Sequence, residues 1–280
     1  MRSIAYGQVV QAVQDLCIEA NCNLGTDLLQ AFERAKAEEK SATGKEIMDQ
    51  LIENASIAAS DQVPLCQDTG FAVFFVELGQ QVQISGGLLT DAINEGVRRG
   101  YSEGFLRKSI VNHPFDRVNT GDNTPAVIHL SLVEGDQLKI TFAPKGGGSE
   151  NMSGLKMLKP ADGLEGVKQY VLTQVEAAGP NPCPPIIVGV GIGGTFEKCA
   201  TLAKEALLRP VGQPHSDPQI AALESELLKD INKLGIGPQG LGGTTTALAV
   251  HIEIFPCHIA SLPVAVNINC HSSRHKEIIL

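Results

Sequence analysis

Three of the seven cysteines lie in loops where a thiol can do chemistry. Cys66 lies in the polar turn PLCQDTG, Cys183 in the proline-rich loop NPCPP, and Cys270 at the start of CHSSR. Each stands next to a strand-like segment, and a cysteine fixed at such a junction has less use in packing than one in a helical stripe. Three thiolates of this kind can ligate three irons of a cubane cluster and leave the fourth iron open as a Lewis acid.

The residues alone leave two other roles open for these thiols. Core packing is the commonest role of a cysteine in a reduced protein. A zinc site is the second, because Cys257-His258 and Cys270-His271, together with His275, offer enough ligands. However, the chain has no C-x-x-C pair, and an apolar strand separates the two Cys-His pairs. On chemistry alone we rank core thiols first, a cluster second and zinc third.

Three glycine-rich segments form the second feature: 145–151 (KGGGSEN), 189–195 (GVGIGGT) and 240–246 (GLGGTTT). Glycines let backbone N–H groups converge on an anion, so three such segments favour an anionic ligand. The middle segment also fits G-x-G-x-x-G after an apolar strand. Because the following helix runs into a proline-rich loop and a second helix, we expect no completed βαβ unit and keep nucleotide binding as an alternative.

The bulk composition narrows the class of protein. The chain has 280 residues, 43% of them hydrophobic and 19% charged, and a net charge of −9, which predicts a folded protein with a sizeable core. Nucleic acid is a poor partner for an acidic chain without basic clusters. No apolar stretch has the roughly 20 residues that cross a membrane, and no signal peptide is recognisable at the N-terminus. We therefore expect a cytoplasmic protein whose cysteines do not form a disulfide framework.

The elements that must position these residues predict a mixed α+β fold. The N-terminal part, about 1–60, is predicted to form a helical layer, with Thr43 and Glu46 at the spacing of a capping box. An αβ part with glycine-rich loops follows. Because no repeat or linker interrupts the chain, a single domain over 1–280 is predicted.

Periodicity gives the expected elements beyond the N-terminal layer. Helices are predicted at 88–100, 164–178, 196–208 and 218–234. Strands are predicted at 72–78, 126–133, 137–142, 185–190, 247–255 and 262–269. The turn Glu134-Gly135-Asp136 predicts that the second and third of these strands form a hairpin.

Four segments together resemble the motifs of the class I, iron–sulfur-dependent fumarases and tartrate dehydratases. They are PLCQDTG, KGGGSENMS, NPCPP with GIGGT, and NINCHSSR. The likeness runs from about residue 10 to residue 277, and the four motifs are specific when taken jointly. The resemblance implies small mixed β-sheets and a [4Fe-4S] cluster with Cys66, Cys183 and Cys270 as its ligands.

The same resemblance implies roles for residues around a substrate. Asp68 matches an acid of the substrate site that shuttles a proton, and Gln67 matches a neighbouring polar contact. Arg107 matches an arginine that binds a substrate carboxylate, and Gly147 falls in a loop whose backbone contacts the substrate. His258, twelve residues before the third cluster ligand, matches a histidine that contacts the substrate. Asp68 and His258 are thus the expected catalytic residues.

The activity implied is the reversible hydration of fumarate to (S)-malate, a reaction of the tricarboxylic acid cycle. Dehydration of L-tartrate to oxaloacetate is the close alternative; a nucleotide-binding and a zinc-stabilised protein are alternatives of other classes. The cluster acts as a Lewis acid and is oxygen-sensitive. Single-chain members of the family carry a further C-terminal domain, so this chain resembles a separate α subunit that needs a β subunit, in an expected α2β2 assembly.

Overall fold

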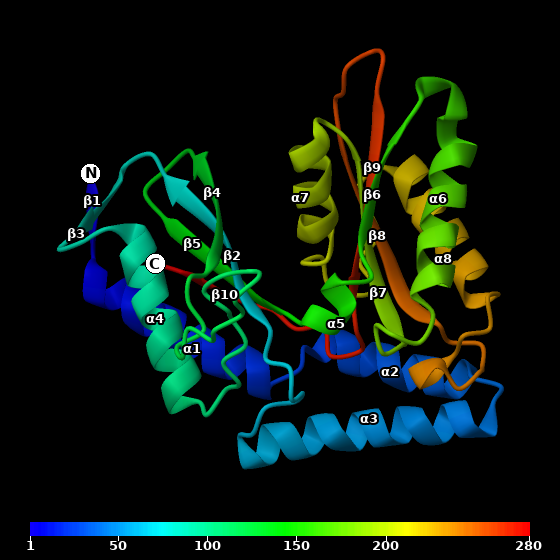
Figure 1. Ribbon diagram of the computed structural model, residues 1–280, viewed down its shortest axis with the longest axis horizontal. Coiled ribbons are helices and arrows are strands. Elements are labelled where there is room, and N and C mark those ends of the chain that lie inside the picture. The colour runs from blue at the N-terminus through cyan, green and yellow to red at the C-terminus, as the bar shows by residue number, and fades with distance from the viewer. The chain divides into compact units, whose positions relative to one another are not determined.

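The computed structural model describes residues 1–280, and the chain folds into two compact units. Unit 1 comprises residues 1–25, 55–147 and 274–280, and unit 2 comprises residues 26–54 and 148–273. Both units combine helices with a small mixed sheet, which confirms the predicted α+β class (Figure 1). The prediction that the whole chain is one domain stays a prediction.

Unit 1 contains a four-stranded sheet in the order β10-β5-β2-β4 and a two-stranded sheet, β1-β3. Strand β2 runs parallel to β4 and antiparallel to β5, which also pairs antiparallel with β10. The elements are β1 (Arg2–Ala5), α1 (Tyr6–Cys22), β2 (Phe71–Gly79), β3 (Val82–Ser85), α4 (Leu89–Glu103), β4 (Val127–Val133), β5 (Leu138–Lys145) and β10 (Lys276–Ile279).

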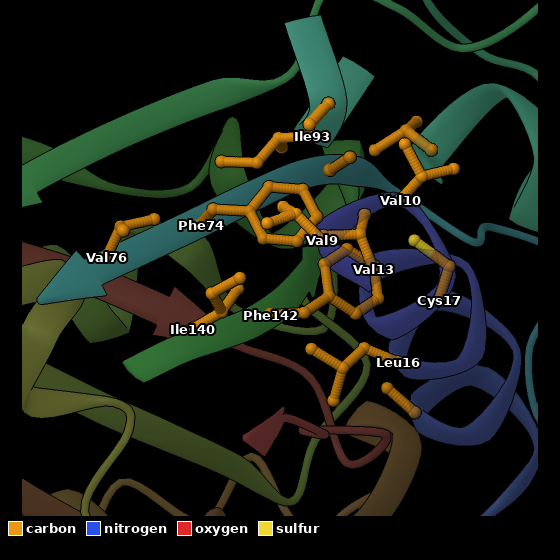
Figure 2. Packing of buried hydrophobic residues seen from close by; sticks show 14 of the residues in the cluster. Val9, Val10, Val13, Leu16, Cys17, Phe74, Val76, Ile93, Ile140 and Phe142 are labelled. Atoms are coloured by element: carbon orange, nitrogen blue, oxygen red, sulfur yellow. The ribbon is translucent and has the colours of Figure 1, made fainter. Parts of the chain in front are cut away.

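The core of unit 1 lies between the sheet and the helices α1 and α4. Figure 2 shows Val9 and Val13 of α1 beside Phe74 of β2 and Phe142 of β5. The two phenylalanine rings stand 5.0 Å apart, and both side chains are fully buried. Burial of each side chain of this size contributes about 1.5–3 kcal/mol. Cys17 of α1 is 0% exposed and belongs to the same core.

The hairpin predicted over 126–142 is wrong, although both of its strands exist. Strand β2 lies between β4 and β5 in the sheet. The turn after β4 passes around the end of β2, where the Gly79 N–H donates to the Gln137 carbonyl (2.9 Å) and the Gln81 N–H to the Gly135 carbonyl (3.0 Å). The turn is real, but the apolar strand 71–79 takes the place between its two arms.

Unit 2 contains a second four-stranded sheet, in the order β6-β9-β7-β8. Strands β7 and β8 are parallel, whereas β9 is antiparallel to both β7 and β6. Helices α6 and α8 cover one face of this sheet and α7 the other (Figure 1). The elements are α2 (Thr26–Glu38), β6 (Gly154–Leu158), α6 (Gly163–Ala178), β7 (Ile186–Gly193), α7 (Phe196–Ala206), α8 (Pro218–Asn232), β8 (Ala247–Phe255), β9 (Leu262–Asn269) and the 3-10 turns Pro160–Asp162 and Pro238–Gly240.

Helices α3 (Ala42–Asp61) and α5 (Gly147–Glu150) contain boundaries between the units. The predicted capping box is wrong: the hydroxyl of Ser41 accepts the Gly44 N–H (3.1 Å), so α3 begins before Thr43. The predicted longer helices and strands are all present, whereas β1, β3, β6 and β10, each of four or five residues, were not predicted. None of the helices combines the length and the hydropathy that crossing a membrane requires.

Candidate functional site

The loop from Cys66 to Gly70 in unit 1 gathers several of the predicted site residues. One carboxylate oxygen of Asp68 accepts the Gly70 N–H (3.0 Å), and the other accepts the Gly147 N–H (2.8 Å). The Thr69 hydroxyl donates to the carbonyl of Arg107 (2.8 Å). The backbones of Arg107 and Gly147 therefore lie beside the same loop as Asp68, and the side chain of Arg107 is exposed.

Cys66 is partly exposed at the start of this loop, and its sulfur accepts the Asp68 N–H at 3.4 Å. Hydrogen bonds of this kind stabilise thiolates and adjust the potential of iron–sulfur clusters. Gln67, between the two, is exposed. Gly70 has a φ of +73°, and a Cβ there would stand 2.6 Å from the Lys145 backbone. Only glycine therefore lets the loop lie this close to the end of β5.

Buried side chains that the sequence did not single out hold the carbonyls of this loop. The Tyr101 hydroxyl donates to Thr69 (2.7 Å), the Asn123 amide to Gly70 (3.2 Å), and the Arg274 guanidinium to Asp68 (2.9 Å). Burial raises the pKa of Tyr101, so its phenol stays a neutral donor. Arg274 is the last residue of the motif CHSSR. Its place in this motif was the one feature of the sequence that could have identified it as a site residue.

In unit 2, Cys183 and Cys270 lie at the same end of the sheet. Cys183 precedes β7 and Cys270 directly follows β9, and these strands pair with Ile187 opposite Asn269. The His271 N–H donates to the Cys183 carbonyl (3.2 Å), which ties the two loops together. Cys183 is exposed and has a φ of +55°, a strained backbone conformation that is typical of functional positions.

Exposure separates the seven cysteines into two groups. The side chain of Cys199 is buried, its S–H donates to the Gly191 carbonyl (3.1 Å), and burial raises its pKa to about 12. A thiol of this kind stays protonated, whereas a metal ligand must be a thiolate. Burial likewise raises the pKa of Cys17 and Cys22. The accessible thiols are Cys66, Cys183, Cys257 and Cys270.

The donor set that the resemblance implies thus fits a cluster in its chemistry. Its three thiols are accessible, one accepts a backbone hydrogen bond, and two stand on loops that are bonded to each other. Cys66 belongs to unit 1, and Cys183 and Cys270 belong to unit 2. The structure contains no group of three or more His, Cys, Asp or Glu side chains in the geometry of a metal site.

The structure does not bring His258 to the cysteines of unit 2. His258 lies between β8 and β9, at the opposite end of the sheet from Cys270. The eight residues of β9 separate the two ends by about 26 Å at about 3.3 Å per residue. Within one chain, His258 therefore cannot contact the same small substrate as a cluster on Cys270. The same distance excludes the zinc site that combines Cys257-His258 with Cys270-His271.

The middle glycine-rich segment has a structural role. Gly189 and Gly191 lie inside β7 against α7, and a Cβ on Gly191 would stand 2.2 Å from the Cys199 carbonyl. The glycines thus allow close packing of helix on strand, which leaves no room for a phosphate. The expectation of an incomplete βαβ crossover is wrong, because β8 lies parallel to β7 after two intervening helices.

The third glycine-rich segment already binds an anion, the carboxylate of Glu39. The N–H groups of Thr244 and Thr245 donate to it at 2.8–3.0 Å, and the side chain is 2% exposed. Burial raises the pKa of Glu39, but hydrogen bonds from Ser41, Thr244 and Thr245 outweigh this and lower the pKa to about 2. The anion that this segment binds is therefore a side chain of the same chain.

The third glycine-rich segment and the residue before it also support the loop of Cys183. The Gln239 N–H and side-chain amide both donate to the Pro184 carbonyl, at 2.8 and 2.9 Å. The Ile186 N–H donates to the Thr246 carbonyl (2.9 Å). Of the three glycine-rich segments, the one at Gly147 is therefore the one that lies beside predicted substrate-binding residues.

The chain as a whole matches a known family. A family model described as fumarate hydratase (Fumerase) covers residues 10–279. The chain belongs to the fumarate hydratase (Fumerase) family. The resemblance seen in the four motifs is thereby confirmed, and the class of reaction is that of a hydro-lyase.

Named relatives of this Fumerase-family chain are α subunits. It is 46% identical over 273 residues to a putative L(+)-tartrate dehydratase subunit alpha of Methanocaldococcus jannaschii, with 95% of each chain covered. It is 34% identical over 280 residues to the L(+)-tartrate dehydratase subunit alpha of Escherichia coli O157:H7, covering 99% of this chain and 92% of the relative.

Proposed function

We propose that the chain is the α subunit of a [4Fe-4S]-dependent hydro-lyase that dehydrates L-tartrate to oxaloacetate together with a β subunit. The observation that carries this proposal is the Cys66–Gly70 loop, where a predicted cluster ligand and the Asp68 carboxylate are fixed beside Arg107 and Gly147. The sequence motifs alone had placed fumarate first, but the names of the relatives favour tartrate as the substrate.

In this proposal, Cys66, Cys183 and Cys270 hold the cluster. When bound, the cluster supplies a Lewis acid for the departing hydroxyl group. The buried thiols Cys17 and Cys199 take no part. Because such a cluster is oxygen-sensitive, we propose that the enzyme works in the reducing cytoplasm.

The chain's own residues bind and deprotonate the substrate. Arg107 pairs with one substrate carboxylate through its guanidinium, which suits a two-point contact. The Gly147 backbone and the Gln67 side chain contact the substrate beside it. Asp68 takes the proton from the carbon next to the one that loses its hydroxyl, so that the C–H and C–O bonds break and a C=C bond forms. For tartrate the product is an enol, which becomes oxaloacetate by tautomerisation.

A catalytic role for His258 requires a second copy of the chain in this proposal. Since His258 and Cys270 lie at opposite ends of β9, the histidine of one chain would serve the site of another. The same loop region exposes apolar side chains, with Phe255 50% and Ile259 92% exposed, which suits a contact between copies. An α2β2 assembly meets this requirement.

The experiment that tests the proposal compares two substrates. The α and β subunits are co-expressed and purified without oxygen, and formation of oxaloacetate from L-tartrate and of malate from fumarate is measured. We expect kcat/KM to be at least about tenfold higher for tartrate, because the site must hydrogen-bond a second hydroxyl. A preference for fumarate would establish the second candidate, which the family description favours. Activity with neither substrate, in a preparation that holds its cluster, would reject both candidate reactions. The α subunit alone should be inactive.

A further inference from the structure

The guanidinium of Arg274 is buried in unit 1 beside the proposed catalytic loop. Arg274 is 6% exposed, and its Nη2 donates both to the Asp68 carbonyl (2.9 Å) and to the side-chain oxygen of Asn21 (3.1 Å). Its Nε donates to the same Asn21 oxygen at 3.3 Å. Burying an arginine costs hydration free energy, which these hydrogen bonds must offset.

Asn21 connects this arginine to the end of helix α1. Its side-chain N–H donates to the Cys17 carbonyl (2.8 Å), which orients the amide with its oxygen toward Arg274. The main-chain carbonyl of Asn21 accepts the Leu65 N–H (2.8 Å). Asn21 is 0% exposed, so these hydrogen bonds are shielded from competing water.

The segment from Leu65 to Asp68 is therefore held at both ends by one buried residue. Asn21 holds Leu65 directly, and it holds Asp68 through Arg274. Cys66 lies between these two anchors, and its sulfur accepts the Asp68 N–H. Displacement of the Asp68 backbone would move the thiol ligand and the carboxylate together.

We infer that Arg274 is a positioning residue, which fixes Cys66 and Asp68 by bonding the Asp68 carbonyl to Asn21 at the end of α1. The inference rests on the proposed function, because that function gives Asp68 and Cys66 their chemical roles. Proton transfer is sensitive to placement, and a shift of about 1 Å costs about 100-fold in rate. A lysine at position 274 keeps the charge but cannot donate in two directions from one rigid plane.

The test uses the α–β complex with Arg274→Met, Arg274→Lys, Asn21→Ala and the double variant R274M/N21A. We expect Arg274→Met to lower kcat by about 10–100-fold while KM changes less than about threefold, with partial recovery in Arg274→Lys. The double variant should be no worse than Arg274→Met, because the two residues act in series. The matched control is Arg98→Met in α4, an exposed arginine paired with Glu95 and Asp122, which should leave kcat unchanged.

A second readout is independent of catalysis. Amide hydrogen exchange in the cluster-free chain should become at least about tenfold faster in residues 65–70 of Arg274→Met and stay unchanged in the core strand β2. A wild-type kcat in Arg274→Met, or additive losses in the double variant, would overturn the inference. If the wild-type complex itself is inactive, the proposed function fails, and the exchange measurement still decides whether Arg274 fixes the loop.

Discussion

Replacement of Glu39 by glutamine should destabilise unit 2. The carboxylate accepts the N–H groups of Lys40 and Ser41 from its own chain segment, at 2.8 and 2.9 Å, and those of Thr244 and Thr245 from a loop about 205 residues away. Glutamine keeps one acceptor oxygen and places an NH2 group against donors. The substitution therefore removes a charge and leaves buried N–H groups without an acceptor.

The magnitude follows from the pKa of this group. The pKa falls from its ordinary 4.5 to about 2 in the folded chain. Since a tenfold change in an equilibrium constant corresponds to about 1.4 kcal/mol, ionised Glu39 stabilises the fold by about 3 kcal/mol at neutral pH. A folded-state pKa below the unfolded one means that this contribution is complete above about pH 4.5. It is lost as the pH falls through about 2.

Urea unfolding followed by far-UV circular dichroism measures this effect, since the chain has no Trp to report by fluorescence. The free energy of unfolding of Glu39→Gln should be about 3 kcal/mol below that of the wild type at pH 7. The difference should shrink steadily below pH 4.5. Glu38→Gln, the same change at the exposed neighbouring residue, is the matched control. A loss of unfolding free energy at Glu39 no larger than at Glu38 would show that the buried carboxylate does not stabilise the fold.

Three further predictions concern the site and its supports. Gly191→Ala should cost about 1–3 kcal/mol of unfolding free energy, because its Cβ would meet the α7 backbone at 2.2 Å, whereas Gly7→Ala, with nothing within 4 Å, should not destabilise. In the cluster-free chain at pH 8, iodoacetamide should alkylate Cys183 at least about 100-fold faster than Cys199, and equal rates would contradict the assigned burial. Asp68→Asn should lower kcat about 100- to 10,000-fold without loss of iron, and retained activity would remove Asp68 from the mechanism.

Local sequence patterns correctly predicted the helices and the turn, because these elements form from residues that are close together in the sequence. The amphipathic periodicity of 164–178 and 218–234 gave α6 and α8 to within a few residues, because a helix buries one face wherever it packs. The turn at Glu134-Gly135-Asp136 was also real. Its hairpin was not, because the place beside β4 belongs to β2, and nothing near the turn encodes that competition.

For the candidate site, too, the sequence predicted the local motifs but not the contacts between distant segments. Motifs identified Asp68 and Gly147, and the structure brings them together at 2.8 Å between carboxylate and N–H. The contacts that support the site lie far apart in sequence, since Arg274 reaches Asn21 across 253 residues. His258 shows the opposite relation between distance along the sequence and distance in the fold. His258 and Cys270 are only twelve residues apart in the sequence. The extended strand β9 lies between them and places them at opposite ends of the sheet.

The proposed cluster is tested by counting iron and acid-labile sulfide after anaerobic reconstitution. Wild type is compared with Cys66→Ser, Cys183→Ser, Cys270→Ser and the buried control Cys199→Ser. We expect about four irons per chain in wild type and in Cys199→Ser, and loss of the cluster in each of the other three variants. A cluster that persists in any of those three variants, or wild type that binds no iron, would show that Cys66, Cys183 and Cys270 do not together hold a cluster.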